Sequence, residues 1–132
     1  MSAQENLDRA REFLAAYWRA DLSEALACCA PGATIELAKS LPLTTPAPVA
    51  EVLPRIFREV YVRFENGRFE VTIDSTLAAE DRVLIEYTAR GRLATGRSFD
   101  CRYAAVLEFG AGAIERLRMY TDTGYVAAAL MS

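Results

Sequence analysis

The sequence contains no histidine, and this absence excludes much common chemistry. Histidine is the most frequent metal ligand in proteins and a frequent general base, so a metal site or an acid–base site in this chain would have to be built from other residues. The three cysteines, Cys28, Cys29 and Cys101, do not have the spacing of metal ligands. Adjacent cysteines also rarely bond to each other, because the geometry is strained. We therefore expect no metal, no other cofactor, and three apolar thiols in a reducing compartment.

Long apolar runs and an excess of positive charge are missing as well. No segment approaches the length of a membrane span, and the N-terminus has no basic, apolar leader. The net charge of -3 argues against a nucleic-acid partner, because binding phosphates requires a net basic face. These features predict a cytoplasmic protein that binds neither nucleic acid nor membrane.

The chain has 132 residues, of which 52% are hydrophobic and 25% are charged. This length and composition predict one globular domain over residues 1–132. A chain of this size buries enough surface to fold without a disulfide or a metal ion.

Helical signals dominate the first half of the sequence. Ser2 and Glu5 have the spacing of a capping box, and the apolar period that follows predicts a helix ending near Trp18. A second cap at Asp21 predicts a shorter helix that ends at Pro31-Gly32. A short strand over 33–38 and a third helix from Thr44 should follow. Pro54 lies within that third helical pattern, where it is expected to cause a kink or a restart.

Strand signals dominate the second half. Alternating segments over 69–77, 83–92, 99–109 and 114–120 are separated by turn residues, among them Gly110-Ala111-Gly112. Asp122 has the position of an N-cap for a short C-terminal helix. The order predicts an α+β fold in which a strongly curved, mostly antiparallel sheet holds the N-terminal helices in its concave face.

This order of elements resembles the nuclear transport factor 2-like superfamily, in particular its SnoaL-like and ketosteroid isomerase-like branch. The most recognisable stretches are Ala33-Thr34-Ile35-Glu36, Ile85-Glu86-Tyr87-Thr88-Ala89-Arg90-Gly91, Phe99-Asp100-Cys101-Arg102-Tyr103 and Met119-Tyr120-Thr121-Asp122-Thr123. The resemblance implies the cone-shaped fold of that superfamily. It does not imply one activity, because this scaffold carries unrelated functions.

The catalytic positions of the resembled enzymes are largely replaced in this chain. The oxyanion-hole tyrosine, the general-base aspartate and the protonated aspartate of the ketosteroid isomerases fall on Phe13, Leu37 and Ala105. Without a donor and a base, ketosteroid isomerisation by that machinery is excluded. The arginine and two aspartates of the limonene epoxide hydrolases fall on Glu86, Thr88 and Met119.

This register and strand alternation together predict the side chains that face the hollow. The predicted catalytic residues are Glu86 and Tyr103, and the predicted ligand-binding residues are Phe13, Tyr17, Ile35, Leu37, Thr88, Cys101, Ala105, Leu117, Met119 and Thr121. The set is mostly apolar, which indicates a polycyclic, steroid-like or polyketide-like ligand. A carboxylate in such a hollow loses hydration, so Glu86 would have a raised pKa suited to acid–base catalysis. The alternative is that Glu86 pairs with Arg90 or Tyr103 and only completes the wall.

The opposite face of the last two long strands should carry small apolar residues bordered by ions. Its predicted members are Asp100, Arg102, Ala104, Val106, Glu108, Arg116, Arg118 and Tyr120. Such a face suits a twofold contact, and the resemblance implies a homodimer there. Three functions therefore stay open: an acid–base isomerase, cyclase or hydrolase; a non-catalytic ligand-binding protein; and a dimeric interaction protein whose hollow is packed shut.

Overall fold

The computed structural model describes residues 2–38 and 43–130. In chain order the elements are α1 (Ala3–Trp18), α2 (Leu22–Ala27), β1 (Cys29–Glu36), β2 (Ala47–Pro48), α3 (Val49–Glu59), η1 (Tyr61–Arg63), η2 (Glu65–Gly67), β3 (Glu70–Ala78), β4 (Arg82–Arg92), β5 (Ser98–Gly110), β6 (Ala113–Thr121) and α4 (Thr123–Leu130). None of the helices in these described segments is long and apolar enough to cross a membrane.

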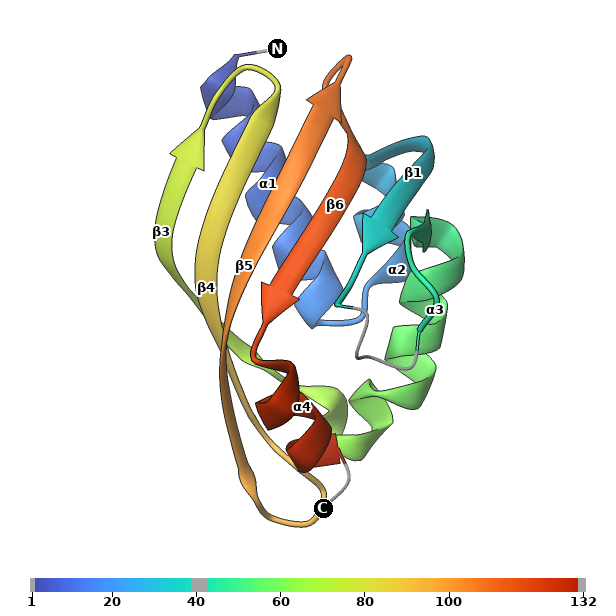
Figure 1. Cartoon of the computed structure of the whole chain (residues 1–132), viewed down its shortest axis with the longest axis vertical. Coiled ribbons are helices and arrows are strands. Elements are labelled where there is room, and N and C mark those ends of the chain that lie inside the picture. The colour runs from blue at the N-terminus through green and yellow to red at the C-terminus, as the bar shows by residue number, and fades with distance from the viewer. Residues whose placement is uncertain (1, 39–42, 131–132) are drawn as a thin grey trace.

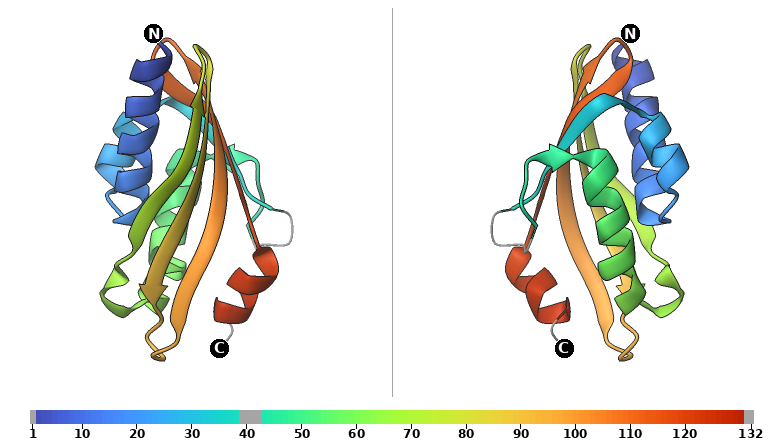
Figure 2. Two further views of the ribbon diagram at one scale, coloured as in Figure 1. Left: turned by 90° about the vertical axis from the view of Figure 1, so that its left-hand side faces the viewer. Right: turned by 90° about the vertical axis from the view of Figure 1, so that its right-hand side faces the viewer.

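The strands form one curved sheet in the order β2-β1-β6-β5-β4-β3. Neighbouring strands are antiparallel except β1 and β6, which run parallel. Helix α1 packs across β3, β4 and β6, and α3 packs against β1, so both helices cover the same face (Figures 1 and 2). Helix α4 lies at the end of the molecule farther from the N-terminus (Figure 1). The predicted α+β cone with a short C-terminal helix is confirmed.

Local signals place the starts of α1 and α4 where the sequence predicts them. The Ser2 side chain accepts a hydrogen bond from the backbone N–H of Glu5, whose carboxylate accepts one from the N–H of Ser2, at 3.1 Å each. The Asp122 carboxylate accepts a bond of 3.0 Å from the N–H of Tyr125 and caps α4. Each cap satisfies amide donors that the helix itself leaves without partners.

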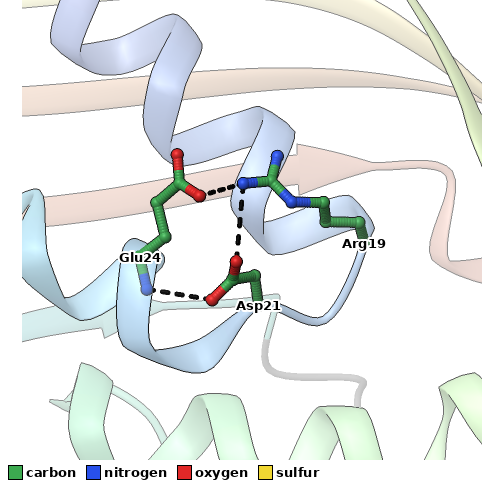
Figure 3. Close-up of polar contacts among 3 residues, drawn as sticks. All are labelled: Arg19, Asp21 and Glu24. Atoms are coloured by element: carbon green, nitrogen blue, oxygen red, sulfur yellow. Dashed lines mark hydrogen bonds and ion pairs between the residues drawn. The ribbon is translucent and has the colours of Figure 1, made fainter.

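The turn between α1 and α2 is fixed by a small polar cluster (Figure 3). Asp21 caps α2 by accepting a bond of 3.1 Å from the N–H of Glu24. The guanidinium of Arg19 hydrogen-bonds the Glu24 carboxylate and lies 3.5 Å from Asp21 Oδ2. The backbone ends α1 directly after Trp18: Ala20 has a φ of 58°, and the N–H of Asp21 donates to the carbonyl of Ala16 at 2.9 Å.

Two predicted boundaries are wrong. The second helix ends at Ala27, and Pro31-Gly32 belongs to β1, within a stretch where the register against β6 is irregular. The third helix begins at Val49 rather than Thr44, because Pro46 and Pro48 bias the residues before them toward extended backbone. Pro54, where a kink or a restart is predicted, lies inside this one continuous helix, so the helix does not restart there.

Candidate ligand pocket

A pocket of about 750 Å³ lies beside Tyr17 and Trp18, at the C-terminal end of α1. It is lined by α1, α3, η1, β5, β6, α4 and the segment after β1. The described lining residues are Tyr17, Trp18, Leu37, Ala38, Leu43, Arg55, Ile56, Glu59, Val60, Tyr61, Arg63, Phe64, Phe69, Phe99, Tyr103, Met119, Thr121, Val126, Ala127 and Leu130. Figure 1 shows that the elements at this end come from both halves of the chain.

Aromatic rings packed around Trp18 form most of one wall. The ring centre of Trp18 lies 6.0 Å from that of Tyr61 in a stacked arrangement. It also lies 4.9 Å from Phe69 and 5.1 Å from Tyr103, both edge-on. Behind the wall, Tyr87 stacks on Tyr103 at 5.2 Å with an interplanar angle of 5°. Stacked and edge-on rings of this kind make a closely packed, apolar surface.

The tyrosine hydroxyls of this region are held in their neutral form. Burial raises the pKa of Tyr103 well above its usual value, and the neighbouring Cys101 and Tyr87 raise it further. Burial is also the main cause of the raised pKa of Tyr61 and of Tyr17. The Tyr61 hydroxyl donates to the backbone carbonyl of Tyr17 at 2.8 Å. Protonated hydroxyls can donate hydrogen bonds to a ligand, but they are poor proton acceptors near neutral pH.

Charge is confined to one side of the pocket. The Nε of Arg55 donates to the Glu59 carboxylate at 2.8 Å, one turn along α3. Arg63 donates to the backbone carbonyl of Leu130 at 2.7 Å and to that of Glu59 at 3.3 Å. Among the described lining residues, Glu59 supplies the only carboxylate, and it is paired with Arg55.

The structure brings some of the predicted ligand residues to this pocket and leaves others in the core. The lining includes Tyr17, Leu37, Tyr103, Met119 and Thr121. The remaining inward residues are almost fully buried in the packing around it: Phe13, Ile35, Ala105, Leu117 and Cys101. Cys101 Sγ lies 3.0 Å from the Thr121 hydroxyl, which donates to the backbone carbonyl of Arg102. Thr121 therefore keeps an oxygen lone pair for a ligand donor.

Glu86 does not face the hollow, so its predicted orientation is wrong. Its side chain is exposed on the outer face of the sheet, where its carboxylate accepts a bond of 2.7 Å from the Ser75 hydroxyl. Thr88 also lies on this face and donates to the Asp74 carboxylate at 2.8 Å. Neither residue lines the pocket.

The error is a shift of one residue along β4. The buried residues of this strand's inner face are Val83, Ile85, Tyr87 and Ala89. Tyr87 is paired across the strands with Tyr103, so both rings lie on the same side of the sheet. Because side chains alternate, Glu86 and Thr88 must then lie on the opposite side. Arg90, the proposed partner of Glu86, instead forms an ion pair with Asp100, with 3.4 Å between Arg90 Nε and Asp100 Oδ2.

Sequence reasoning also missed several residues that line the pocket. Trp18 is predicted only as the end of the first helix and not as a pocket residue, and Tyr61, Phe64 and Phe69 follow α3 in sequence. The recurrence of aromatics after α3 is the one signal that could have found them. The contribution of Arg63 depends on the return of α4, which no local pattern indicates.

These features describe a cone-shaped α+β protein with an aromatic pocket, and comparison with known proteins agrees on the fold. The SnoaL-like domain family matches residues 10–117, and the chain belongs to this family. No curated protein matches the sequence.

Three solved structures show the same fold over almost the whole chain. An NTF2-like protein of unknown function from Burkholderia pseudomallei K96243 has a TM-score of 0.82 at 20% identity, covering 97% of this chain and 98% of its own. An NTF2-like protein from Burkholderia thailandensis E264 has a TM-score of 0.78 at 27% identity, covering 95% and 96%. TerC, co-crystallised with polyporic acid, has a TM-score of 0.83 at 14% identity, covering 97% and 99%.

Proposed function

We propose that this protein binds a flat, largely apolar small molecule in the pocket beside Trp18. The observation that carries the proposal is a cavity of about 750 Å³ whose walls are mostly aromatic and aliphatic. Typical ligand sites have about 300–1,000 Å³ and place a few polar groups on an apolar surface. The TerC structure supports this use of the fold, since that protein was co-crystallised with a small organic molecule.

Within this proposal Tyr103 and Thr121 orient the ligand rather than transfer protons. Tyr103 offers a neutral hydroxyl, and Thr121 offers an acceptor oxygen beside it. Because Glu86 lies on the other face and Glu59 is ion-paired, no described lining residue is a free carboxylate. Binding without acid–base catalysis is therefore the function that the geometry favours.

Trp18 gives a direct test, because it is the only tryptophan in the chain and lies in the pocket wall. Planar polycyclic compounds added to the protein should change its fluorescence in a saturable manner. Ala127→Phe, which fills the pocket from α4, should abolish this response. Ala128→Phe is the matched control, since Ala128 is exposed on the same helix and does not line the pocket. Saturable binding that is unaffected by Ala127→Phe would place the ligand elsewhere.

We also propose that the outer sheet face forms a homodimer, because apolar side chains gather there without cover. Leu77 is 69% exposed, Leu84 40% and Tyr120 52%. Cross-strand pairing puts Leu77, Leu84 and Val106 in one row, and the Glu108–Arg118 ion pair lies beside it. An apolar row bordered by ions is self-complementary about a twofold axis.

The oligomeric state can be measured by light scattering after size-exclusion chromatography. Leu84→Glu should convert a dimer into a monomer, because it places a charge in the centre of the apolar row. Val62→Glu is the control, because Val62 is 69% exposed but lies on η1, away from the sheet. A wild-type monomer at high micromolar concentration would exclude the dimer.

A further inference from the structure

We infer that the ligand carries an anionic group, and that Arg63 binds this group at the charged side of the pocket. This inference rests on the proposed binding function and adds the chemical class of the ligand. It would be an apolar ring system with one acidic substituent, such as a carboxylate, a sulfonate or an ionised phenol.

Positive charge exceeds negative charge around the pocket. The described lining contains two cations, Arg55 and Arg63, and one anion, Glu59. Arg55 is paired with Glu59. Among the described residues, no carboxylate lies within ion-pair distance of Arg63, whose recorded bonds go only to backbone carbonyls. The pocket therefore presents one positive charge that no described protein anion compensates.

The Arg63 guanidinium is held in place by two hydrogen bonds but keeps further N–H donors. Its NH1 donates to the carbonyl of Leu130 at the end of α4, and its Nε donates to the carbonyl of Glu59. The backbone carbonyl of Arg63 accepts a bond of 2.9 Å from the N–H of Ala94. A guanidinium has five N–H donors arranged in a planar fork. Donors thus remain for a ligand oxygen, and a charged acceptor binds them more strongly than a carbonyl does.

The rest of the pocket disfavours a charged group. The wall around Trp18 is aromatic, and the hydroxyls of Tyr61 and Tyr103 are neutral. A charged group placed against such a wall would lose hydration without compensation. An acidic ligand should therefore bind with its rings against Trp18 and its anion beside Arg63.

Two fluorescent probes isolate this contribution. 1-Anilinonaphthalene-8-sulfonate and N-phenyl-1-naphthylamine share one ring system, and only the first carries an anion. The dissociation constants of both probes are measured for the wild type and for each variant, and the ratio of the two constants is the readout. Circular dichroism checks that each variant is folded, and Ala127→Phe identifies binding outside the pocket.

The expected changes have opposite signs at two neighbouring residues. Arg63→Met should weaken sulfonate binding about tenfold, the effect of one charge-assisted contact, while changing neutral-probe binding less than about twofold. Glu59→Gln removes the anion that pairs with Arg55, so it should tighten sulfonate binding by about threefold. Arg58→Met, a control on the same helix outside the lining, should leave both constants unchanged. Arg63→Lys keeps the positive charge, so it should weaken sulfonate binding less than Arg63→Met does.

The outcomes separate this inference from the proposed function. If Arg63→Met weakens both probes equally, Arg63 only fastens α4 to η1 and the inference is wrong. It is also wrong if Glu59→Gln leaves the ratio unchanged, a test that survives even if the Arg63 variant fails to fold. If neither probe binds the wild type in an Ala127→Phe-sensitive manner, the binding function itself fails.

Discussion

Replacing Tyr103 by leucine should destabilise the protein and weaken ligand binding together, because one ring serves both purposes. Tyr103 is stacked on Tyr87 at 5.2 Å and meets the edge of Trp18 at 5.1 Å. Each such pair contributes about 0.5–1.5 kcal/mol beyond its buried area, so losing both costs about 1–3 kcal/mol. Leucine is smaller and leaves part of the ring's volume empty, which places the expected cost in the upper half of that range.

The matched variant is Tyr103→Phe, which keeps both ring contacts and removes only the hydroxyl. Its free energy of unfolding should lie within about 1 kcal/mol of the wild type, the size of one hydrogen bond. Urea denaturation followed by circular dichroism gives both free energies, and the Trp18 fluorescence titration gives the affinities. For a ligand that accepts a hydrogen bond from Tyr103, the phenylalanine variant should lose affinity while keeping its stability.

Two results would contradict this reasoning. The first is a free energy of unfolding for Tyr103→Leu that lies within about 0.5 kcal/mol of the wild-type value, which is the lower limit for one aromatic pair. In that case the stacked rings do not stabilise the wall. If both variants bind every ligand as the wild type does, Tyr103 does not face the ligand, and the pocket must be used on the side of α3.

Three further outcomes follow from contacts away from that wall. Glu86→Gln should leave ligand binding unchanged, because Glu86 is exposed on the outer face; a loss of binding in the titration would mean that this face communicates with the pocket. Asp122→Ala should lower the free energy of unfolding by about 1 kcal/mol, the typical value of a lost N-cap, measured by urea titration. The hydrogen bond from Arg118 lowers the pKa of Glu108 in the folded protein below the value of 4.5 expected for the unfolded chain. The stability that this pair contributes is therefore present above pH 4.5 and is lost as the pH falls through the lower, folded-state pKa. Glu108→Gln should reduce the dependence of the free energy of unfolding on pH in this acid range.

The elements of this fold were largely predictable because their signals are local. A capping box, an N-cap before α4 and the glycine-rich turn between β5 and β6 each depend on a few adjacent residues. In that turn Ala111 and Gly112 have φ values of 52° and 81°, a conformation that a glycine-rich segment permits. The family resemblance extended these local signals to the arrangement of the sheet, and the fold bears it out.

The register of β4 was not predictable, because both faces of that strand carry apolar side chains. Leu84 is 40% exposed on the outer face, while its neighbours Val83 and Ile85 are fully buried. Apolar alternation on β5 is clearer, since Arg102 is exposed between the buried or half-buried side chains of Cys101 and Tyr103. Tyr87 of β4 pairs with Tyr103 of β5, so knowledge of this pairing would have placed Tyr87 on the inner face and Glu86 on the outer face of the sheet. The outer apolar row that obscured the pattern is the row to which we assign the dimer.

The pocket stays open because the side chains around it are tied to other partners. Tyr61 is fixed by its bond to the Tyr17 carbonyl, and Arg63 joins η1 to the end of α4. Asp122 holds the first turn of α4 at the end of β6. Without such ties, apolar walls around a space of this size would gain contacts by collapsing onto one another. A hollow kept open at the expense of those contacts is expected where a ligand supplies them instead. Binding should therefore raise the midpoint of thermal unfolding, and the rise should continue with the logarithm of the free ligand concentration above the dissociation constant. A compound that leaves the midpoint unchanged at concentrations well above its dissociation constant does not bind the folded form in preference to the unfolded chain, and this result would contradict binding in the pocket.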